Sequence, residues 1–372
     1  MSVTVALFRD FSEDRRMSME VYANGLSEAL HAFFSEQCQV REYLPRLPNW
    51  LGDDKWSLRL ARYSIYPWQV RRRQGQINHI LDHGYGHLVH VLDRERTIVT
   101  VHDLIPMVRW RGGIPDLARG RKPWLNLFSF DALRRARHLI AISENTRHDL
   151  IRYCRCKPGN ISVVHYGVEK MFRVYSPAEK DMARHKWNLP ADGTRRVLIS
   201  GAQPYKNQVG ALQAFARLRA LPDCPTELVQ VGLPNPEWTR LVQRFGLENA
   251  IRCLGIVAHH EMPEIYNCVE LLFFPSSYEG FGRPPLEAMA CGTPVVASNA
   301  ASLPEVIADA GLMCAPRDYD GLAQAVYAVL TNGDLRQSLI ERGLKRASRF
   351  TWERTAKKTL EVYERVANGS QC

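Results

Sequence analysis

The chain has 372 residues and a formal net charge of +10, and its composition is 45% hydrophobic and 24% charged. This length predicts two domains, and this composition excludes a disordered or fibrous protein. Nine scattered cysteines suit reduced thiols in the cytoplasm better than a disulfide framework. The first ten residues predict a strand in place of a signal peptide, and every apolar run is far shorter than the roughly 18 residues that span a membrane.

From the first residues onward, apolar strand-like runs alternate with helix-length amphipathic stretches. In the first half we expect helices at Tyr22–Phe34 and Leu125–Arg137. This alternation is typical of parallel α/β sheets. The strands expected in the first half are Val3–Phe8, Ile77–Leu81, Thr97–Val101 and His138–Ile142.

The second half continues the pattern with helices such as Val209–Ala220 and Tyr319–Leu330. Its expected strands are Arg196–Ser200, Glu227–Val231, Ile251–Leu254, Leu271–Phe274, Val295–Ala297 and Gly311–Met313. The alternation stops over residues 165–192, where we place a linker. The sequence therefore predicts two doubly wound domains, 1–185 and 193–350, with a ligand cleft between them and a last helix at 352–368.

The positive charge belongs to the first half. Up to Pro190 the chain has 30 Lys and Arg residues against 20 Asp and Glu, and after it 19 against 19. Within the first half, Arg109–Lys157 carries twelve basic and four acidic residues, and Arg71–Arg73 forms a compact cluster. An anionic partner fits these clusters, and so does an ordinary solvated surface.

The most informative segment is Leu271–Glu305. A buried strand leads into a loop with Gly280 and Gly282, and a helix begins near Pro284, where proline is tolerated because the first helical N–H groups lack partners. Backbone amides and the positive end of a helix then converge, which predicts a phosphate site.

Glu279 and Glu287 flank this loop with seven residues between them. Carboxylates repel phosphate and accept hydrogen bonds from hydroxyls, so a sugar nucleotide would satisfy both kinds of group. The alternative is a helix-dipole role for Glu287 and a plain loop charge for Glu279.

The run EGFGRPPLEAMACGTPVVAS, residues 279–298, closely resembles the E-x7-E signature of retaining family 4 glycosyltransferases, which have the GT-B fold. The resemblance implies that Glu279 contacts the transferred sugar and Glu287 the nucleotide ribose. It also implies that amides of Phe281 and Gly282 lie near the sugar and diphosphate, and it brings the neighbouring motif residues Arg283 and Leu286 into the donor site.

Other segments resemble the same family. VLISGAQPYKN, residues 197–207, looks like the first strand and loop of the donor domain, with Gly201 in the loop and Lys206 as the cation on the diphosphate. Val257 looks like the residue closest to the base, and His102, in VHDLIP, like the histidine facing the sugar. The last helix of the family packs back across the first domain.

Two places depart from the family pattern. A second basic residue usually precedes the lysine, and here those places hold Ala202, Gln203 and Tyr205. Many relatives have a Gly-Gly pair after the first strand, whereas this chain has residues 16–20, RMSME, which predicts contact with the acceptor more than with phosphate.

Two groups of residues raise the question of a metal. His79, His83, His87 and His90 are spaced four, four and three apart, but Gly84 and Gly86 interrupt any helix that would align them, so we expect no metal there. The segment DHGYGHL, residues 82–88, resembles an acceptor-side loop instead. Asp318 and Asp320 spell D-x-D before a helix, where capping is the stronger explanation.

The resemblance implies a metal-independent, retaining hexosyltransferase without a cofactor. It would move a mannose- or glucose-type sugar from a GDP- or UDP-sugar to a glycan or lipid-linked acceptor in cell-surface polysaccharide synthesis. We expect it in the cytoplasm, with peripheral contact to anionic membrane and no nucleic acid partner. The alternatives are a GT-B-fold epimerase or phosphorylase, or a non-catalytic binder of an anionic polymer.

Overall fold

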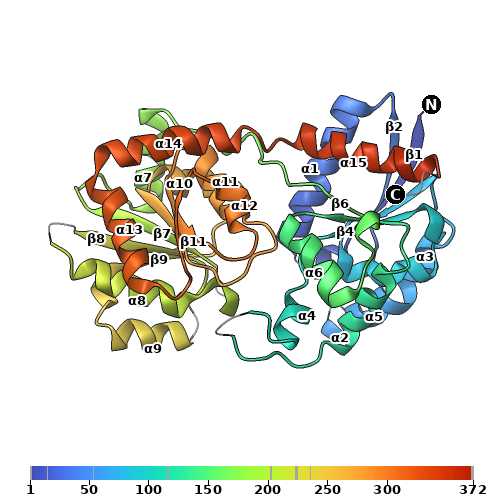
Figure 1. Cartoon of the computed structure of the whole chain (residues 1–372), viewed down its shortest axis with the longest axis horizontal. Helices are drawn as coiled ribbons and strands as arrows, with labels where there is room; N and C mark the ends of the chain where they lie inside the picture. Colours follow the sequence, from blue (N-terminus) through green and yellow to red (C-terminus); the bar gives the residue numbers. More distant parts are fainter. Residues whose placement is uncertain are drawn as a thin grey trace. The chain divides into compact units, whose positions relative to one another are not determined.

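The computed structural model describes residues 2–14, 16–52, 54–114, 117–201, 203–222, 225–234 and 236–369. They form two compact units, each with a six-stranded parallel sheet (Figure 1). One unit contains residues 1–113, 118–167 and 350–372, and the other contains residues 114–117 and 168–349. The predicted fold class, two doubly wound parallel-sheet domains, is confirmed.

The sheet of the first unit has the strand order β2-β1-β3-β4-β5-β6. Three of its four inner strands are buried along their whole length, as parallel sheets covered on both faces require. The strands are β1 (Val3–Phe8), β2 (Cys38–Tyr43), β3 (Ile77–Ile80), β4 (Thr97–Val101), β5 (His138–Ala141) and β6 (Ile161–Val163).

Helices surround this sheet, and the last helix of the chain is among them. Gly25 lies against the indole of Trp352, and a Cβ at position 25 would come 2.3 Å from that ring. The glycine therefore lets the chain end pack on the first helix. The helices are α1 (Met17–Phe34), α2 (Lys55–Leu60), α3 (Tyr66–Val70), α4 (Ile105–Trp110), α5 (Trp124–Leu133), α6 (Glu144–Cys154) and α15 (Trp352–Ala367).

The sheet of the second unit has the order β12-β11-β10-β7-β8-β9. Its strands are β7 (Arg195–Ser200), β8 (Thr226–Val231), β9 (Ile251–Gly255), β10 (Leu271–Phe274), β11 (Val295–Ser298) and β12 (Leu312–Cys314). Phe215, Phe273 and Val326 lie in its hydrophobic core. The helices are α7 (Pro177–Trp187), α8 (Gln208–Arg219), α9 (Pro236–Arg244), α10 (Met262–Asn267), α11 (Arg283–Ala290), α12 (Leu303–Ile307), α13 (Tyr319–Thr331) and α14 (Gly333–Ala347).

The chain passes from the first unit to the second at residue 168, near the start of the linker that we expected at 165–192. Residues 168–185, which we expected in the first domain, cluster with the second unit. The side chain of Asn267 accepts from the Tyr175 amide at 2.9 Å and donates to the Arg173 carbonyl at 2.9 Å. Trp187 Nε1 donates to Glu264 at 2.6 Å. These bonds fasten the segment to α10.

No helix in the described part of the chain combines the length and apolar composition needed to cross a bilayer. The seven described cysteines, which exclude Cys224 and Cys372, are all free thiols.

Candidate functional site

The strand order of the second unit reverses between β7 and β10. From β7 the chain proceeds outward to β8 and β9, and it then returns to β10 on the other side of β7. In doubly wound sheets, ligands bind beyond the carboxyl ends of the strands at such a reversal. The loops that leave β7 and β10 carry Lys206 and Glu279.

Lys206 and Glu279 form an ion pair at this reversal. Lys206 Nζ lies 2.7 Å from Glu279 Oε1, and the two side chains are 14% and 10% exposed. The ammonium also lies 4.6 Å from the ring centroid of Phe274, at the end of β10. The pair is held by both loops and keeps limited access to solvent, so each charge can exchange its partner for a polar group of a ligand.

The loop that carries Glu279 is fixed through its backbone. The buried hydroxyl of Ser302 donates to the carbonyl of Glu279 at 3.0 Å and bonds the Phe281 carbonyl at 2.6 Å. The Ser277 amide donates to the Tyr205 carbonyl at 2.8 Å, which joins this loop to the loop of Lys206. The site is therefore preorganised by main-chain bonds.

Gly282 turns the chain into helix α11. Its φ of +116° lies in the left-handed region, and a Cβ there would come 2.9 Å from a methyl group of Leu303. A glycine is therefore required at this position. The helix then begins at Arg283 with prolines in its first turn, as predicted, and its positive end lies beside the loop of Glu279.

The remaining expected donor residues lie around the same reversal. Phe281 and Leu286 are buried, and Val257 is buried beyond β9. The Gly201 carbonyl, at the end of β7, accepts a bond from Gln208 Nε2 at 3.0 Å. Ala202 lies outside the described residues.

Glu287 is almost completely buried and its two oxygens have different partners. Tyr266 donates its hydroxyl to Oε2 at 3.1 Å, and Arg283 Nη2 donates to Oε1 at 2.9 Å. Burial, together with the charge of Glu287, raises the pKa of Tyr266 well above its usual value. The phenol therefore stays a donor, and it orients the carboxylate.

Arg283 links Glu287 to two residues that the sequence did not indicate, Glu169 and His259. Its Nη2 lies 3.2 Å from Glu169 Oε1 and 3.1 Å from His259 Nε2, and these two atoms are 2.7 Å apart. Burial raises the pKa of Glu169, but the hydrogen bond with His259 and the charge of Arg283 outweigh it, so the pKa lies below its usual value. Glu169 is therefore an anion at neutral pH.

Among the described residues, Glu169, His259 and Glu287 form the one group whose donor atoms lie close enough to hold a metal ion, within 4.8 Å of one another. Arg283 Nη2 lies within 3.2 Å of an atom of each of them, so a cation is already supplied there by the chain. Asp318 caps α13 by accepting from the Gly321 amide at 2.9 Å, as predicted.

The histidines at 79–90 do not share a centre. His79 bonds Tyr363 and Thr100, each at 2.7 Å, whereas His83 lies 3.1 Å from Asp82 and His87 bonds the Arg62 carbonyl at 2.9 Å.

Residues 82–88 resemble an acceptor-side loop in sequence, but their aromatic side chains are not accessible to an acceptor. His83, Tyr85 and His87 are buried, and His83 and His87 stack on phenylalanines of α5. The segment forms a 3-10 helix, His83–His90, that packs against α5. Its rings fill the space between α5 and the sheet, so they are not accessible to an acceptor.

His102 lies in the first unit, directly after β4. Its ring is buried, with Nε2 donating to the Leu81 carbonyl at 2.7 Å and Nδ1 bonded to the Tyr166 hydroxyl. Contact with a sugar requires the Nε2–H to exchange the Leu81 carbonyl for a sugar hydroxyl, so this role stays a prediction.

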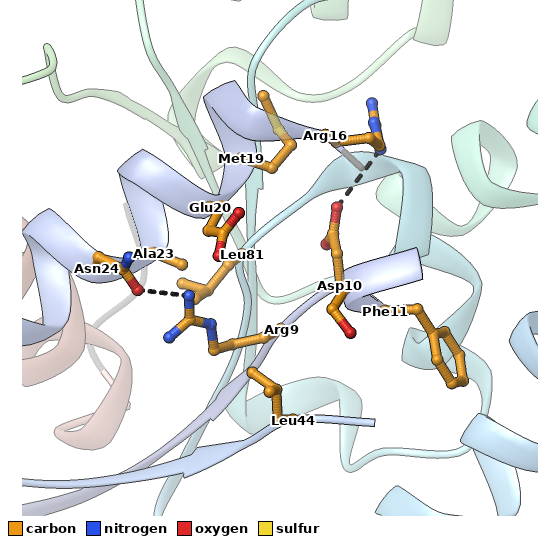
Figure 2. A pocket seen from close by; sticks show the side chains of 11 residues that line it. Arg9, Asp10, Phe11, Arg16, Met19, Glu20, Ala23, Asn24, Leu44 and Leu81 are labelled. Atoms are coloured by element: carbon orange, nitrogen blue, oxygen red, sulfur yellow. Dashed lines mark hydrogen bonds and ion pairs between the residues drawn. The ribbon is translucent and has the colours of Figure 1, made fainter. Parts of the chain in front are cut away.

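The first unit also has a pocket at its own strand reversal, between β1 and β3. It has a volume of about 210 Å³, and Figure 2 shows Arg9, Asp10, Arg16 and Glu20 around it. Arg9 donates to Asn24 at 2.6 Å, and Arg16 lies 3.6 Å from Asp10. Residues of the segment 16–20, where we expect contact with the acceptor, therefore line this pocket. The pocket offers positive guanidinium groups and also carboxylates, which accept hydrogen bonds from hydroxyls.

Comparison with known proteins agrees with this arrangement. Residues 179–346 match the family Glycosyl transferases group 1, and residues 11–170 match Glycosyltransferase Family 4. The O-antigen chain mannosyltransferase B of Escherichia coli is 32% identical over 275 residues, which is 73% of this chain and 70% of that protein. This chain belongs to the family 4 glycosyltransferases.

Two further relatives extend the comparison. The serotype-specific mannosyltransferase WbdA of Escherichia coli is 28% identical over 283 residues, 74% of this chain and only 34% of that longer protein. The solved structure of sucrose-phosphate synthase from Thermosynechococcus elongatus superposes with a TM-score of 0.78 at 21% identity, covering 99% of this chain and 100% of that one. The glycosyltransferase therefore has the GT-B fold.

Sequence reasoning assigned no individual role to four residues that shape this site: Glu169, His259, Tyr266 and Ser302. Each comes from a segment outside the E-x7-E run, and each acts through one hydrogen bond or two. None of the four belongs to a motif with a fixed spacing, so only the folded chain shows which groups they bond.

Proposed function

We propose that this glycosyltransferase moves a hexose of the mannose or glucose type from a nucleoside diphosphate donor, with retention at the anomeric carbon. The observation that carries the proposal is the Lys206–Glu279 pair at the reversal between β7 and β10, beside the start of α11. It offers one cation and one hydroxyl acceptor at a single point, which is what a sugar diphosphate requires.

In the proposed reaction the bond from the anomeric carbon to the diphosphate breaks, and negative charge develops on the departing oxygen. The ammonium of Lys206 and the positive end of α11 stabilise that charge in place. The departing phosphate then takes the proton of the acceptor hydroxyl, which attacks from the same side. This chemistry uses groups of the chain and the donor, so we propose that it needs neither a metal ion nor a cofactor.

We assign recognition of the donor to the buried carboxylates of Glu279 and Glu287, which accept hydrogen bonds. Glu279 would exchange Lys206 for hydroxyls of the sugar, and Glu287 would accept from the ribose while Tyr266 and Arg283 orient it. Gly201, Phe281 and Gly282 contribute backbone, and Val257 lies near the base. The names of the two Escherichia coli relatives favour a mannosyl donor. The nucleotide of that donor is then to be decided between GDP and UDP.

The acceptor is assigned to the first unit. Arginines and carboxylates around the pocket between β1 and β3 suit the hydroxyls of a glycan, and its apolar lining, which includes Leu44 and Leu81, suits sugar C–H faces. We propose a glycan or a lipid-linked oligosaccharide, as in synthesis of a cell-surface polysaccharide. The free thiols of the described cysteines fit a reducing compartment, at the cytoplasmic face of a membrane.

A panel of sugar nucleotides tests the donor. A ligand of the folded state raises the free energy of unfolding by about 2.7 kcal/mol at a hundredfold excess over its dissociation constant. We expect stabilisation by one GDP- or UDP-hexose, and transfer that gives a product with the donor's anomeric configuration by NMR. Inverted product, release of free epimer, or sugar phosphate formed from free phosphate would replace the proposal by another GT-B reaction.

A further inference from the structure

The segment that follows β2 in the first unit exposes three tryptophans. Trp50, Trp56 and Trp68 are 75%, 76% and 77% exposed, and Leu60, between the last two, is 50% exposed. A single exposed apolar side chain is ordinary on a protein surface, but tryptophan is highly buried on average. Three such residues within nineteen positions call for a partner that takes up indole rings.

Residues 55–70 form one helical run in which α2 continues through a π-helical turn, Ala61–Ile65, into α3. Trp56, Leu60 and Trp68 are separated by four and eight residues. In a regular α-helix, twelve residues would rotate Trp68 about 120° away from Trp56. The π-turn accommodates an extra residue and removes most of that rotation. The three exposed side chains therefore lie along one stripe.

The opposite side of the same run is fixed to the first unit. Ala61, Tyr66 and Val70 are buried to 1% exposure or less. The Tyr66 hydroxyl donates to the Arg9 carbonyl at 2.8 Å, and Arg62 bonds the Gly84 carbonyl at 2.5 Å. Arg9 lines the pocket between β1 and β3, so the tryptophan stripe is a rigid part of the unit and is anchored to the wall of that pocket.

The charge of this segment has one sign. Residues 55–73 contain six basic residues and no acidic one. Five of the six are exposed: Lys55, Arg59, Arg71, Arg72 and Arg73. The Arg59 guanidinium lies 5.0 Å from the Trp56 ring centroid, so cation and indole share one surface.

We propose that residues 55–73 are a membrane-docking surface that binds anionic lipid headgroups. Trp56, Leu60 and Trp68 enter the interfacial layer, where an indole keeps its apolar ring in the acyl boundary and its N–H among the headgroups. The exposed lysine and arginines pair with lipid phosphates, and the helix lies in the plane of the interface. The inference rests on the proposed function only in that a lipid-linked acceptor gives the contact its purpose.

Vesicle binding by the full chain tests the surface without any assay of transfer. The vesicles contain phosphatidylglycerol with phosphatidylcholine, or phosphatidylcholine alone. We expect cosedimentation with the anionic vesicles at low salt, with a blue shift of tryptophan emission. Neutralising Arg71, Arg72 and Arg73 to glutamine should weaken binding about 100-fold, since each basic residue at an anionic leaflet is worth about one kcal/mol, and high salt should reproduce that loss.

The variant W56S/W68S separates docking from simple charge attraction. We expect it to bind at least tenfold more weakly and to lose the blue shift, while Met182→Ser, at a 71% exposed position on α7 of the second unit, binds normally. Equal binding of W56S/W68S and the unchanged protein overturns the proposal, as does equal binding to neutral vesicles. Self-association without lipid that W56S/W68S abolishes would assign the stripe to a second copy of the chain.

The same variants distinguish this surface from the donor site. None of the substituted residues belongs to the loops that carry Lys206 and Glu279, so transfer to a water-soluble acceptor fragment should be unchanged in every variant. Vesicle binding together with no transfer from any sugar nucleotide would leave the docking surface standing and overturn the proposed function. Normal transfer without vesicle binding would do the reverse.

Discussion

The two units place charged side chains at equivalent points, because both sheets reverse their strand order and both reversals carry a cation beside a carboxylate. In the second unit, Lys206 pairs with Glu279 and both side chains keep some exposure. In the first unit, Arg16 pairs with Asp82, whose side chain is fully buried, and also lies 3.6 Å from Asp10. The same topology thus supports one pair whose carboxylate is partly accessible, the open pair, and one pair whose carboxylate is fully buried, the locked pair.

The protonation of the locked pair explains the difference. Burial raises the pKa of Asp10 well above its usual value, and the neighbouring charge of Asp82 raises it further. Burial also raises the pKa of Asp82, but the charge of Arg16 outweighs it, so this pKa falls below its usual value. Asp82 then keeps a fully buried negative charge, while the side chain of Arg16 is 35% exposed. The carboxylate also holds backbone, since Asp82 accepts from the Gly84 amide at 2.9 Å. We therefore expect a ligand to exchange partners with the open pair and only to border the locked pair.

The largest effect that should separate the two pairs is on stability. Asp82→Asn removes the buried charge and leaves Arg16 without its main partner, so we expect the free energy of unfolding to fall by about 3 kcal/mol. Denaturant unfolding measures it. Asp131→Asn is the control, since its pairs with Arg134 and Arg135 are exposed and should contribute less than about 1 kcal/mol. An equal loss in both variants would contradict the distinction.

The open pair should show the opposite behaviour. Glu279→Gln and Lys206→Ala each remove a proposed transition-state contact while leaving no core cavity, so we expect transfer to fall by roughly a hundredfold or more. Initial rates with the stabilising sugar nucleotide measure the loss, and thermal melts check that the variants stay folded. Near-normal transfer by either variant would remove the pair from the donor site.

An effect that is smaller for each residue concerns pH and the buried histidines of the first unit. Burial lowers the pKa of His79 to about 3 and that of His83 to about 3. An unfolded histidine has a pKa of about 6.5, so below that pH only the unfolded state takes up these protons, and stability is lost as pH falls from 6.5 towards 3. We expect a decrease of about 1.4 kcal/mol per pH unit for each histidine.

Denaturant unfolding at pH 7 and pH 5 checks this slope, and His79→Gln should remove one histidine's share of it. A slope that is the same with and without His79 would show that this ring is protonated in the folded chain.

The smallest expected effect is that of metal removal on transfer, where we expect no change. Chelation with EDTA should leave transfer unchanged, because Lys206, Arg283 and the start of α11 supply the positive charge at the donor side. If EDTA abolished transfer and magnesium or manganese restored it, the metal ligands would be Glu169, His259 and Glu287, or Asp318 and Asp320.

The sequence predicted the inner strands well and missed two edge strands. Every expected strand exists within about one residue of its predicted ends, but β2 and β6 were not expected. Both lie at edges of the first sheet, and β2 carries exposed charged side chains while β6 has three residues. An edge strand pairs on one side and faces solvent, so it lacks the continuous apolar run that marks an inner strand.

The amino-acid sequence by itself determined the fold class, the glycine-containing loop at residues 275–282 that leads into a helix, and the family, because each depends on residues that are contiguous in the chain. Only the tertiary structure decided which charges meet. Lys206 reaches Glu279, Arg283 gathers Glu169 and His259, and the tryptophans of residues 50–68 point outward. The reason is physical: hydrogen bonds and ion pairs act over about 3 Å between side chains that the sheet order brings together from distant positions.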